Sequence, residues 1–182
     1  MQDQLERRYE ADRIAARVAE VAQALDREFG GLHLVLISVL KGSSFFLADL
    51  ARKIASPVAC EYISVRRAEG SDQVLQIDFR TEFALGDRPL LLLKDVVGSG
   101  VIENYLIDHL EAQGASKIKL AAIIDKPQER TTDVVVDYPL FSAPRGLFAG
   151  YGMEFRGRFA QLPYIAEVIG APAGVAAPSP GQ

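Results

Sequence analysis

Short, mostly apolar runs constrain the fold of this chain more than any other feature of its sequence. The clearest three cover residues 32–40, 90–93 and 117–124 and are rich in Leu, Val, Ile and Ala. Such runs are typical of strands that are buried on both faces of a parallel sheet, whereas a strand with one solvated face alternates apolar and polar residues. A fourth run, residues 58–65, follows Pro57 and predicts another strand.

Helical patterns separate the predicted strands. Apolar residues recur at helical spacing from Ala11 to Phe29, and further helices are expected over 45–54 and 101–113. Ser43 or Ser44 could cap the second of these helices. Strands that alternate with helices of about 10 to 15 residues imply an α/β fold. We therefore expect a mostly parallel twisted sheet with helices on both faces.

The chain divides into one predicted domain and a tail. The domain covers residues 1–170 and includes a small polar flap at about 66–88, in which residues 73–79 alternate like a hairpin strand. The tail, residues 171–182, is rich in Ala, Pro and Gly and is expected to be disordered. Three shorter segments are further strand candidates: 132–137, 147–149 and 164–169.

Composition and charge exclude several classes of protein. The single cysteine, Cys60, rules out an intramolecular disulfide, and the two histidines, His33 and His109, lack the spacing of zinc ligands. A net charge of −4 argues against a nucleic-acid-binding surface, which usually carries a basic excess. No apolar run approaches the roughly 20 residues of a membrane helix, and the first residues contain no signal core. We expect a cytoplasmic protein that binds neither nucleic acid nor membrane.

Three loops follow predicted strands and are the candidate binding segments. Ligands of parallel α/β sheets bind outside the carboxyl ends of the strands. This rule selects residues 41–44, 95–102 and 125–127. In the second loop, Gly98 and Gly100 permit a tight turn whose amides can point into one concavity at the start of a helix. Such a turn predicts a phosphate site, although its spacing matches neither a Walker loop nor a dinucleotide fingerprint.

Residues 90–102 resemble the ribose-phosphate-binding motif of type I phosphoribosyltransferases, which usually reads two acids, two aliphatic residues, Asp, Thr and Gly. Five other segments resemble the hypoxanthine-guanine branch of that family and occur in the same order along the chain: 40–42, 45–50, 125–127, 150–155 and 162–165. The resemblance is collinear from about residue 10 to residue 168. It implies the fold of that family, with a small hood or flap beside the main sheet.

The resemblance also implies which residues bind the phosphates. The backbone of Lys41 and Gly42 would contact pyrophosphate, across a cis peptide bond that does not involve proline. The 5'-phosphate would be held by the glycine-rich turn and the start of the helix that follows it: Gly98, Ser99, Gly100, Val101 and Ile102.

Three further positions complete the site that the resemblance implies. Lys126 would donate to the 6-oxo group of a purine, and Phe148 would stack on the base. Glu154 stands where the family usually has an Asp that supports Mg²⁺, and Glu carries one more methylene.

The sequence departs from the family pattern at several reactive positions. Lys94 replaces the first acid of the motif, so only Asp95 remains as an acidic catalytic candidate. Gly98 replaces the Asp that the family uses as general acid/base, Ile102 replaces a hydroxyl residue, and Ala160 replaces an Arg. Loss of a general acid/base typically costs about 10²- to 10⁴-fold in rate. Lys94 could be solvated, pair with Asp95 or bind a phosphate directly.

Two hypotheses follow from the resemblance and its departures. In the first, the chain is a purine phosphoribosyltransferase that makes a nucleoside 5'-monophosphate and pyrophosphate from hypoxanthine or guanine and 5-phosphoribosyl 1-diphosphate, with Mg²⁺. In the second, it is a catalytically weakened regulatory homologue that keeps the binding pocket. Regulation by RNA binding is disfavoured by the net charge. The resemblance also implies a homo-oligomer.

Overall fold

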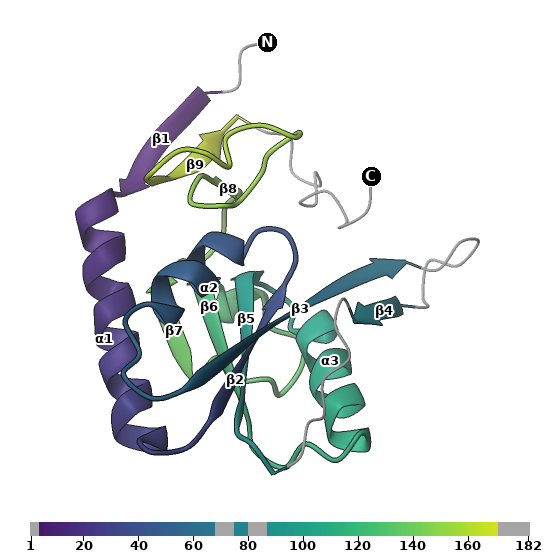
Figure 1. Ribbon diagram of the computed structural model, residues 1–182. Coiled ribbons are helices and arrows are strands. Elements are labelled where there is room, and N and C mark those ends of the chain that lie inside the picture. The colour runs from purple at the N-terminus through teal and green to yellow at the C-terminus, as the bar shows by residue number, and fades with distance from the viewer. Residues whose placement is uncertain (1–3, 68–74, 80–86, 171–182) are drawn as a thin grey trace.

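The larger of two β-sheets forms the centre of the computed structural model, which describes residues 4–67, 75–79 and 87–170 (Figure 1). Its six strands run in the order β4-β3-β2-β5-β6-β7. The strand bounds are β2 (Leu34–Val39), β3 (Val58–Arg67), β4 (Leu75–Phe79), β5 (Leu90–Val97), β6 (Ile118–Asp125) and β7 (Tyr138–Ser142). Neighbours pair in parallel except β4, which is antiparallel to β3. The predicted α/β class is confirmed.

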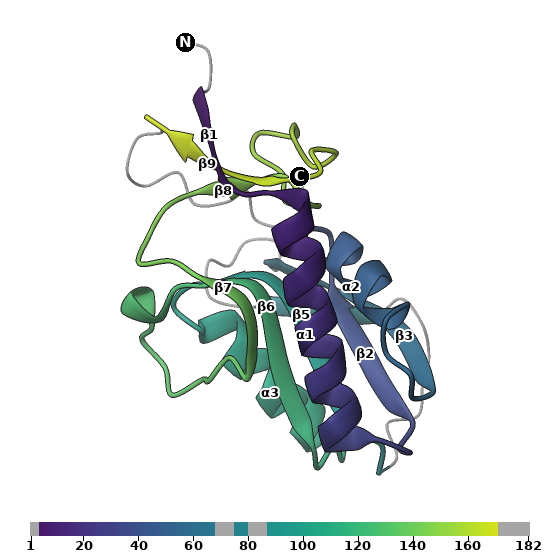
Figure 2. The same cartoon turned by 90° about the vertical axis from the view of Figure 1, so that its left-hand side faces the viewer.

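Helices cover both faces of this sheet (Figures 1 and 2). Helices α1 (Ala11–Phe29) and α2 (Ser44–Ala51) pack on one face, where Leu91 and Leu93 of β5 point. Helix α3 (Val101–Ala112) packs on the other face, against Leu90 and Leu92. Successive side chains of a strand point to opposite faces, so the unbroken run of leucines in β5 serves both cores.

A smaller antiparallel sheet lies outside the main sheet and is separate from the predicted flap. Its order is β1-β9-β8, with β1 at Gln4–Tyr9, β8 at Phe148–Ala149 and β9 at Ile165–Ile169. Figure 1 shows it beyond the edge at which β5 ends, next to the first turn of α1. The segment that joins β8 to β9 thereby reaches the loops that follow the parallel strands.

Two details of the sequence interpretation are wrong. Residues 132–137 form no strand, although they contain three successive valines; the strand is β7, which begins at Tyr138. Strand β1 was not predicted, because its burial is slight along its whole length and it gains its order from pairing with β9. Helix α1 has the predicted bounds, and β5 extends four residues beyond its predicted end, to Val97.

Part of the predicted flap lies outside the described residues, as does the predicted tail, 171–182. Strand β4 coincides with most of the predicted hairpin strand. Within the described ranges, no helix combines the length and the apolar character needed to cross a membrane.

Asp26, near the end of α1, fastens that helix to the connection between α2 and β3. Its carboxylate accepts hydrogen bonds from the amides of Ala55 (3.0 and 3.1 Å) and Ser56 (3.2 Å). The bond from Ala55 and, to a smaller degree, those from Ser56 lower the pKa of Asp26 from its ordinary value. The ionised form is therefore the one that stabilises the fold.

We expect Asp26→Ala to lower the free energy of unfolding at pH 7 by about 1 kcal/mol. The variant lacks the solvent-accessible carboxylate that accepts hydrogen bonds from the two backbone amides. A carboxylate whose pKa is lowered in the folded state stabilises the fold at pH values above the ordinary pKa of Asp. This contribution is lost as the pH falls from that value through the native pKa. The difference between the two proteins should therefore shrink below about pH 4. Urea unfolding at pH 7 and pH 3 measures it. Glu111→Ala, on the exposed side of α3, is the control, and an equal loss in both variants contradicts the assignment.

Candidate active site

The loop after β2 has the conformation that the resemblance led us to expect. The peptide bond between Leu40 and Lys41 is cis. Ser43 does not cap α2 with its side chain; its buried hydroxyl donates to the carbonyl oxygen of Val39 (2.8 Å) and contacts the hydroxyl of Ser38 (2.8 Å). These hydrogen bonds attach the loop to the end of β2 and restrain its backbone conformation.

Gly42 is enclosed by two segments that are distant in sequence. A Cβ atom on Gly42 would lie 2.8 Å from the Cβ of Asp95, so Asp95 packs directly against this backbone. A Cβ on Gly152 would lie 2.7 Å from the carbonyl oxygen of Gly42, and Gly152 has a φ of +92°. Only glycine fits both conditions at position 152. The predicted pyrophosphate loop, the motif of β5 and the segment after β8 therefore meet here.

The turn between β5 and α3 has the form of an anion site. Gly100 adopts a left-handed conformation, with φ +83°, and immediately precedes α3. Within the described part of the chain, the amides of Ser99 and Gly100 have no backbone acceptor, while the Val101 amide has a long bond to Ser99 Oγ (3.4 Å). Unpaired amides at a helix start attract anions. The predicted phosphate-binding residues thus form the turn and the first two positions of α3.

A segment that the sequence analysis overlooked braces this turn. Arg130 donates through Nε to the carbonyl oxygen of Gly98 (2.9 Å), and its guanidinium also pairs with Asp125. The amide of Thr131 donates to the carbonyl oxygen of Ser99 (2.9 Å). The carbonyl oxygens of Gly98 and Ser99 therefore have hydrogen-bond donors within the protein. No local sequence pattern predicts the two contacts with the turn, because each joins residues more than 30 positions apart.

Lys126 is brought to the same place. Its amide donates to the carbonyl oxygen of Val97 (2.9 Å), which attaches it to the end of β5. The residue is only 7% exposed, and its Nζ lies 5.9 Å from the centre of the Phe148 ring and 3.6 Å from Glu129 Oε2. The two predicted base-binding residues therefore lie side by side, with Phe148 almost wholly buried.

Lys94 is largely buried between two carboxylates. Its side chain is 13% exposed, and Nζ lies 3.4 Å from Asp95 and 3.5 Å from Glu103 of α3. Burial by itself would lower the pKa of Lys94, but the two carboxylates outweigh it and raise the pKa above its ordinary value. Pairing with Asp95, one of the alternatives for Lys94, is confirmed. Glu103 was overlooked, although a lysine in a buried strand requires a counterion.

Glu154 and Ala160 lie in the segment between β8 and β9. Glu154 is exposed, and the described residues contain no group of three or more His, Cys, Asp or Glu side chains that could hold a metal ion. Mg²⁺ usually binds one or two carboxylates and completes its shell with substrate phosphates and water, so a lone carboxylate fits such an ion. The carbonyl oxygen of Ala160 accepts from the Gly152 amide (3.0 Å).

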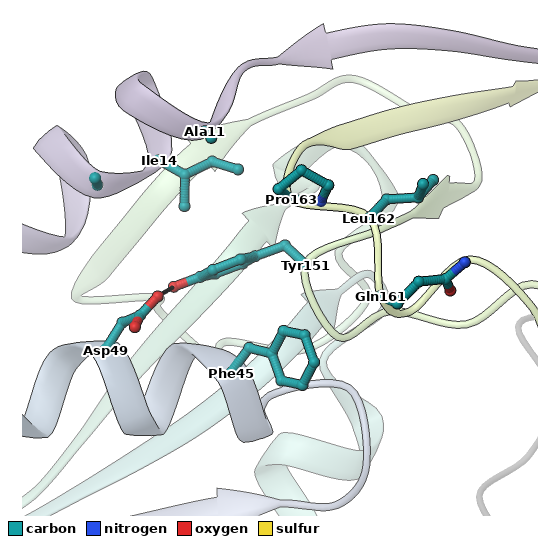
Figure 3. A pocket seen from close by; sticks show the side chains of 9 residues that line it. Ala11, Ile14, Phe45, Asp49, Tyr151, Gln161, Leu162 and Pro163 are labelled. Carbon is teal, nitrogen blue, oxygen red and sulfur yellow. Dashed lines mark hydrogen bonds between the residues drawn. The ribbon is translucent and has the colours of Figure 1, made fainter.

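A pocket of about 310 Å³ lies nearby but contains none of the predicted site residues (Figure 3). It is lined by α1, α2 and residues around Leu162. On its wall the Tyr151 hydroxyl donates to Asp49 (2.8 Å). Burial and this hydrogen bond raise the pKa of Tyr151 well above its usual range, so the phenol remains a donor. The bond joins the segment after β8 to α2.

The buried charges around Lys94 should contribute to the free energy of unfolding. Lys94→Glu would place a third carboxylate beside Asp95 and Glu103, and we expect it to lower the free energy of unfolding by about 3 kcal/mol or more. The exchange variant Lys94→Glu/Glu103→Lys restores opposite charges and should recover at least half of that loss. Urea unfolding of both variants and of wild type measures the effect. A double variant no more stable than Lys94→Glu alone contradicts the coupling.

Comparison with known proteins agrees with this geometry. Residues 4–156 match the family model for the phosphoribosyl transferase domain. The chain is 27% identical to a hypoxanthine-guanine phosphoribosyltransferase of Streptococcus pneumoniae, over 85% of this chain and 87% of that protein. It has the same identity to the bifunctional protein TilS/HprT of Listeria monocytogenes, of whose length it spans only 24%.

Solved structures show the same fold. A hypoxanthine-guanine phosphoribosyltransferase from Bacillus anthracis superposes with a TM-score of 0.85 at 27% identity, covering 92% of this chain and all of that one. A mutant hypoxanthine phosphoribosyltransferase from Trypanosoma cruzi, in a ternary complex with substrates, gives 0.84 at 25% identity, over 91% and 95% of the two chains. Since the family model spans most of the sequence and the fold and loops agree with it, this protein belongs to the phosphoribosyltransferase family.

Proposed function

We propose that the protein joins hypoxanthine or guanine to 5-phosphoribosyl 1-diphosphate and releases pyrophosphate, forming a purine nucleoside 5'-monophosphate. The observation that carries this proposal is the meeting of three loops at one sheet edge: the turn at Gly98–Gly100, the loop at Lys41–Gly42 and Lys126. Relatives that bear the name hypoxanthine-guanine phosphoribosyltransferase match most of the chain and support the same substrates.

The phosphates of the substrate define the first half of the proposed site. The 5'-phosphate accepts hydrogen bonds from the Ser99 hydroxyl and from the amides of the turn and the start of α3, where the helix dipole favours an anion. The backbone of Lys41 and Gly42 faces the pyrophosphate. Asp95, the remaining acid of the motif, lies between these two loops and is our candidate for contact with the ribose.

The base defines the second half. The ammonium group of Lys126 has hydrogen-bond donors and no acceptor, so it complements the 6-oxo group of hypoxanthine or guanine. Adenine presents an amino group at this position, which would leave two donors facing each other. A site built to bond one polar group rejects an analogue that lacks it. The Phe148 ring, next to Lys126, provides the apolar surface for the base.

We further propose that Glu154 contributes to a Mg²⁺ site together with substrate oxygens. When bound, the ion would neutralise the charge that develops on the departing pyrophosphate. The reaction breaks a bond at the anomeric carbon through a cation-like sugar, so positioning and charge complementarity supply much of the catalysis. We also expect the enzyme to act in the cytoplasm, as the absence of an apolar signal core suggested, and to form a homo-oligomer, as the resemblance implies.

Turnover by the purified protein tests the proposal. Pyrophosphate release is measured with 5-phosphoribosyl 1-diphosphate, Mg²⁺ and each of hypoxanthine, guanine, xanthine and adenine in turn. We expect release with at least one 6-oxopurine and little with adenine. No release with any base would contradict the proposal, and GMP binding by calorimetry in that case would favour the regulatory homologue instead.

Lys126→Met tests the base site, because it keeps most of the side-chain volume and removes the donor. We expect the KM for the 6-oxopurine to rise at least about tenfold, equivalent to 1.4 kcal/mol, with the KM for 5-phosphoribosyl 1-diphosphate within threefold of wild type. Steady-state kinetics with each substrate varied in turn gives both values. An unchanged KM for the base would remove Lys126 from the base site.

A further inference from the structure

A carboxylate occupies the space beside Gly98. A Cβ atom built on Gly98 would lie 3.1 Å from Oε2 of Glu129, which belongs to the short 3-10 helix η1 (Pro127–Glu129). The same oxygen lies 3.6 Å from Nζ of Lys126. Glu129 therefore places its charge between the phosphate turn and the lysine of the base site, next to the position at which the sequence lacks the expected acid.

The backbone around Glu129 is attached to the turn that it faces. The Glu129 amide donates to the carbonyl oxygen of Lys126 (3.0 Å). The next residue, Arg130, donates to the carbonyl oxygen of Gly98 (2.9 Å) and to that of Val134 (2.6 Å). These bonds set the distance between η1 and Gly98. The backbone position from which the Glu129 side chain extends is thus set by the fold.

The side chains of Lys126 and Glu129 differ in their exposure to solvent. The Lys126 side chain is 9% exposed, whereas that of Glu129 is 42% exposed. The lysine is enclosed by the protein, and the carboxylate is accessible from solvent. Together they present a donor and an acceptor a few ångströms apart.

That pair matches one edge of a 6-oxopurine. The 6-oxo group and ring nitrogen N7 lie on the same edge of the base. With Lys126 donating to the 6-oxo oxygen, a carboxylate beside it is placed to accept a hydrogen bond from N7–H. Gly98 leaves room for this arrangement, because a side chain there would compete with Glu129 for the same space.

We propose that Glu129 is a catalytic residue, the general base of the reaction. This assignment rests on the proposed function. N9 of the base forms a bond to C1' of the ribose, and the bond from C1' to the pyrophosphate oxygen breaks with its electron pair leaving on pyrophosphate. The proton on N7 passes to the Glu129 carboxylate as the N9 bond forms, so the product base is neutral. In the reverse reaction, protonated Glu129 returns the proton to N7.

The first experiment compares Glu129→Ala and Glu129→Gln with wild type. We expect kcat for the 6-oxopurine that the wild type uses best to fall about 10²-fold or more in both, which is the usual effect of removing a general base. The KM for 5-phosphoribosyl 1-diphosphate and the Kd for GMP, measured by calorimetry, should stay within threefold. Asp133→Asn, which removes one negative charge from the same connection, is the control and should keep kcat within threefold.

The second experiment moves the carboxylate. Gly98 does not adopt a left-handed conformation, so its backbone accepts an aspartate. In Glu129→Ala/Gly98→Asp the vacated space receives a carboxylate from the other side, and we expect at least a tenfold recovery of kcat over Glu129→Ala. Gly98→Asp alone should give no comparable gain, because two carboxylates would then share the space.

The outcomes separate this inference from the proposed function. Wild type without turnover on any 6-oxopurine overturns both. Active wild type with Glu129→Ala within threefold in kcat overturns the inference alone. So does a loss confined to the KM of the base, which would make Glu129 merely a counterion of Lys126. A fall in kcat that Gly98→Asp reverses supports Glu129 as the base.

Discussion

The parallel hydrogen-bonded pairing of β5 with β2 on one side and β6 on the other is the constraint on which the site depends. Parallel neighbours end at the same edge, so the loops after Val39, Val97 and Asp125 emerge together. The strands are buried on both faces by α1, α2 and α3, and this burial fixes which side chains point to each core. A shift of β5 by one residue would exchange its two core faces and move the turn at Gly98–Gly100 away from Lys126.

Charge balance at this edge is achieved between segments rather than within the motif. Lys94 brings a cation into a place where the family usually has an acid, and Glu103 from α3 supplies a buried counterion. Gly98 omits a carboxylate, and Glu129 from η1 brings one to the adjacent space. Both departures are thus met by acidic side chains from other elements. A buried charge without a partner costs several kcal/mol, which is a physical reason for such compensation at position 94.

Much of the fold could be predicted because its strongest signals are local. The 3.6-residue periodicity of α1 and the unbroken apolar runs of β2, β5 and β6 define those elements without knowledge of their neighbours. The wrong predictions concern segments in which pairing with another strand decides whether a strand forms. Val134 to Val136 have high strand propensity, yet they join no sheet and Val135 is 70% exposed. Strand β7 contains Pro139, which an edge strand tolerates, and polar β1 is ordered by β9 from the far end of the domain.

The amino-acid sequence by itself determined the class of fold, the glycine turn before α3 and the order of the loops, because backbone conformation and burial patterns are written in neighbouring residues. The resemblance to a family also singled out Lys41, Gly42 and Lys126 as candidate site residues. Only the tertiary structure decided that Glu103 neutralises Lys94, that Arg130 and Thr131 brace the turn before α3, and that Glu129 faces Gly98. These contacts join residues up to 32 positions apart, and their distances are set by how helices and strands pack.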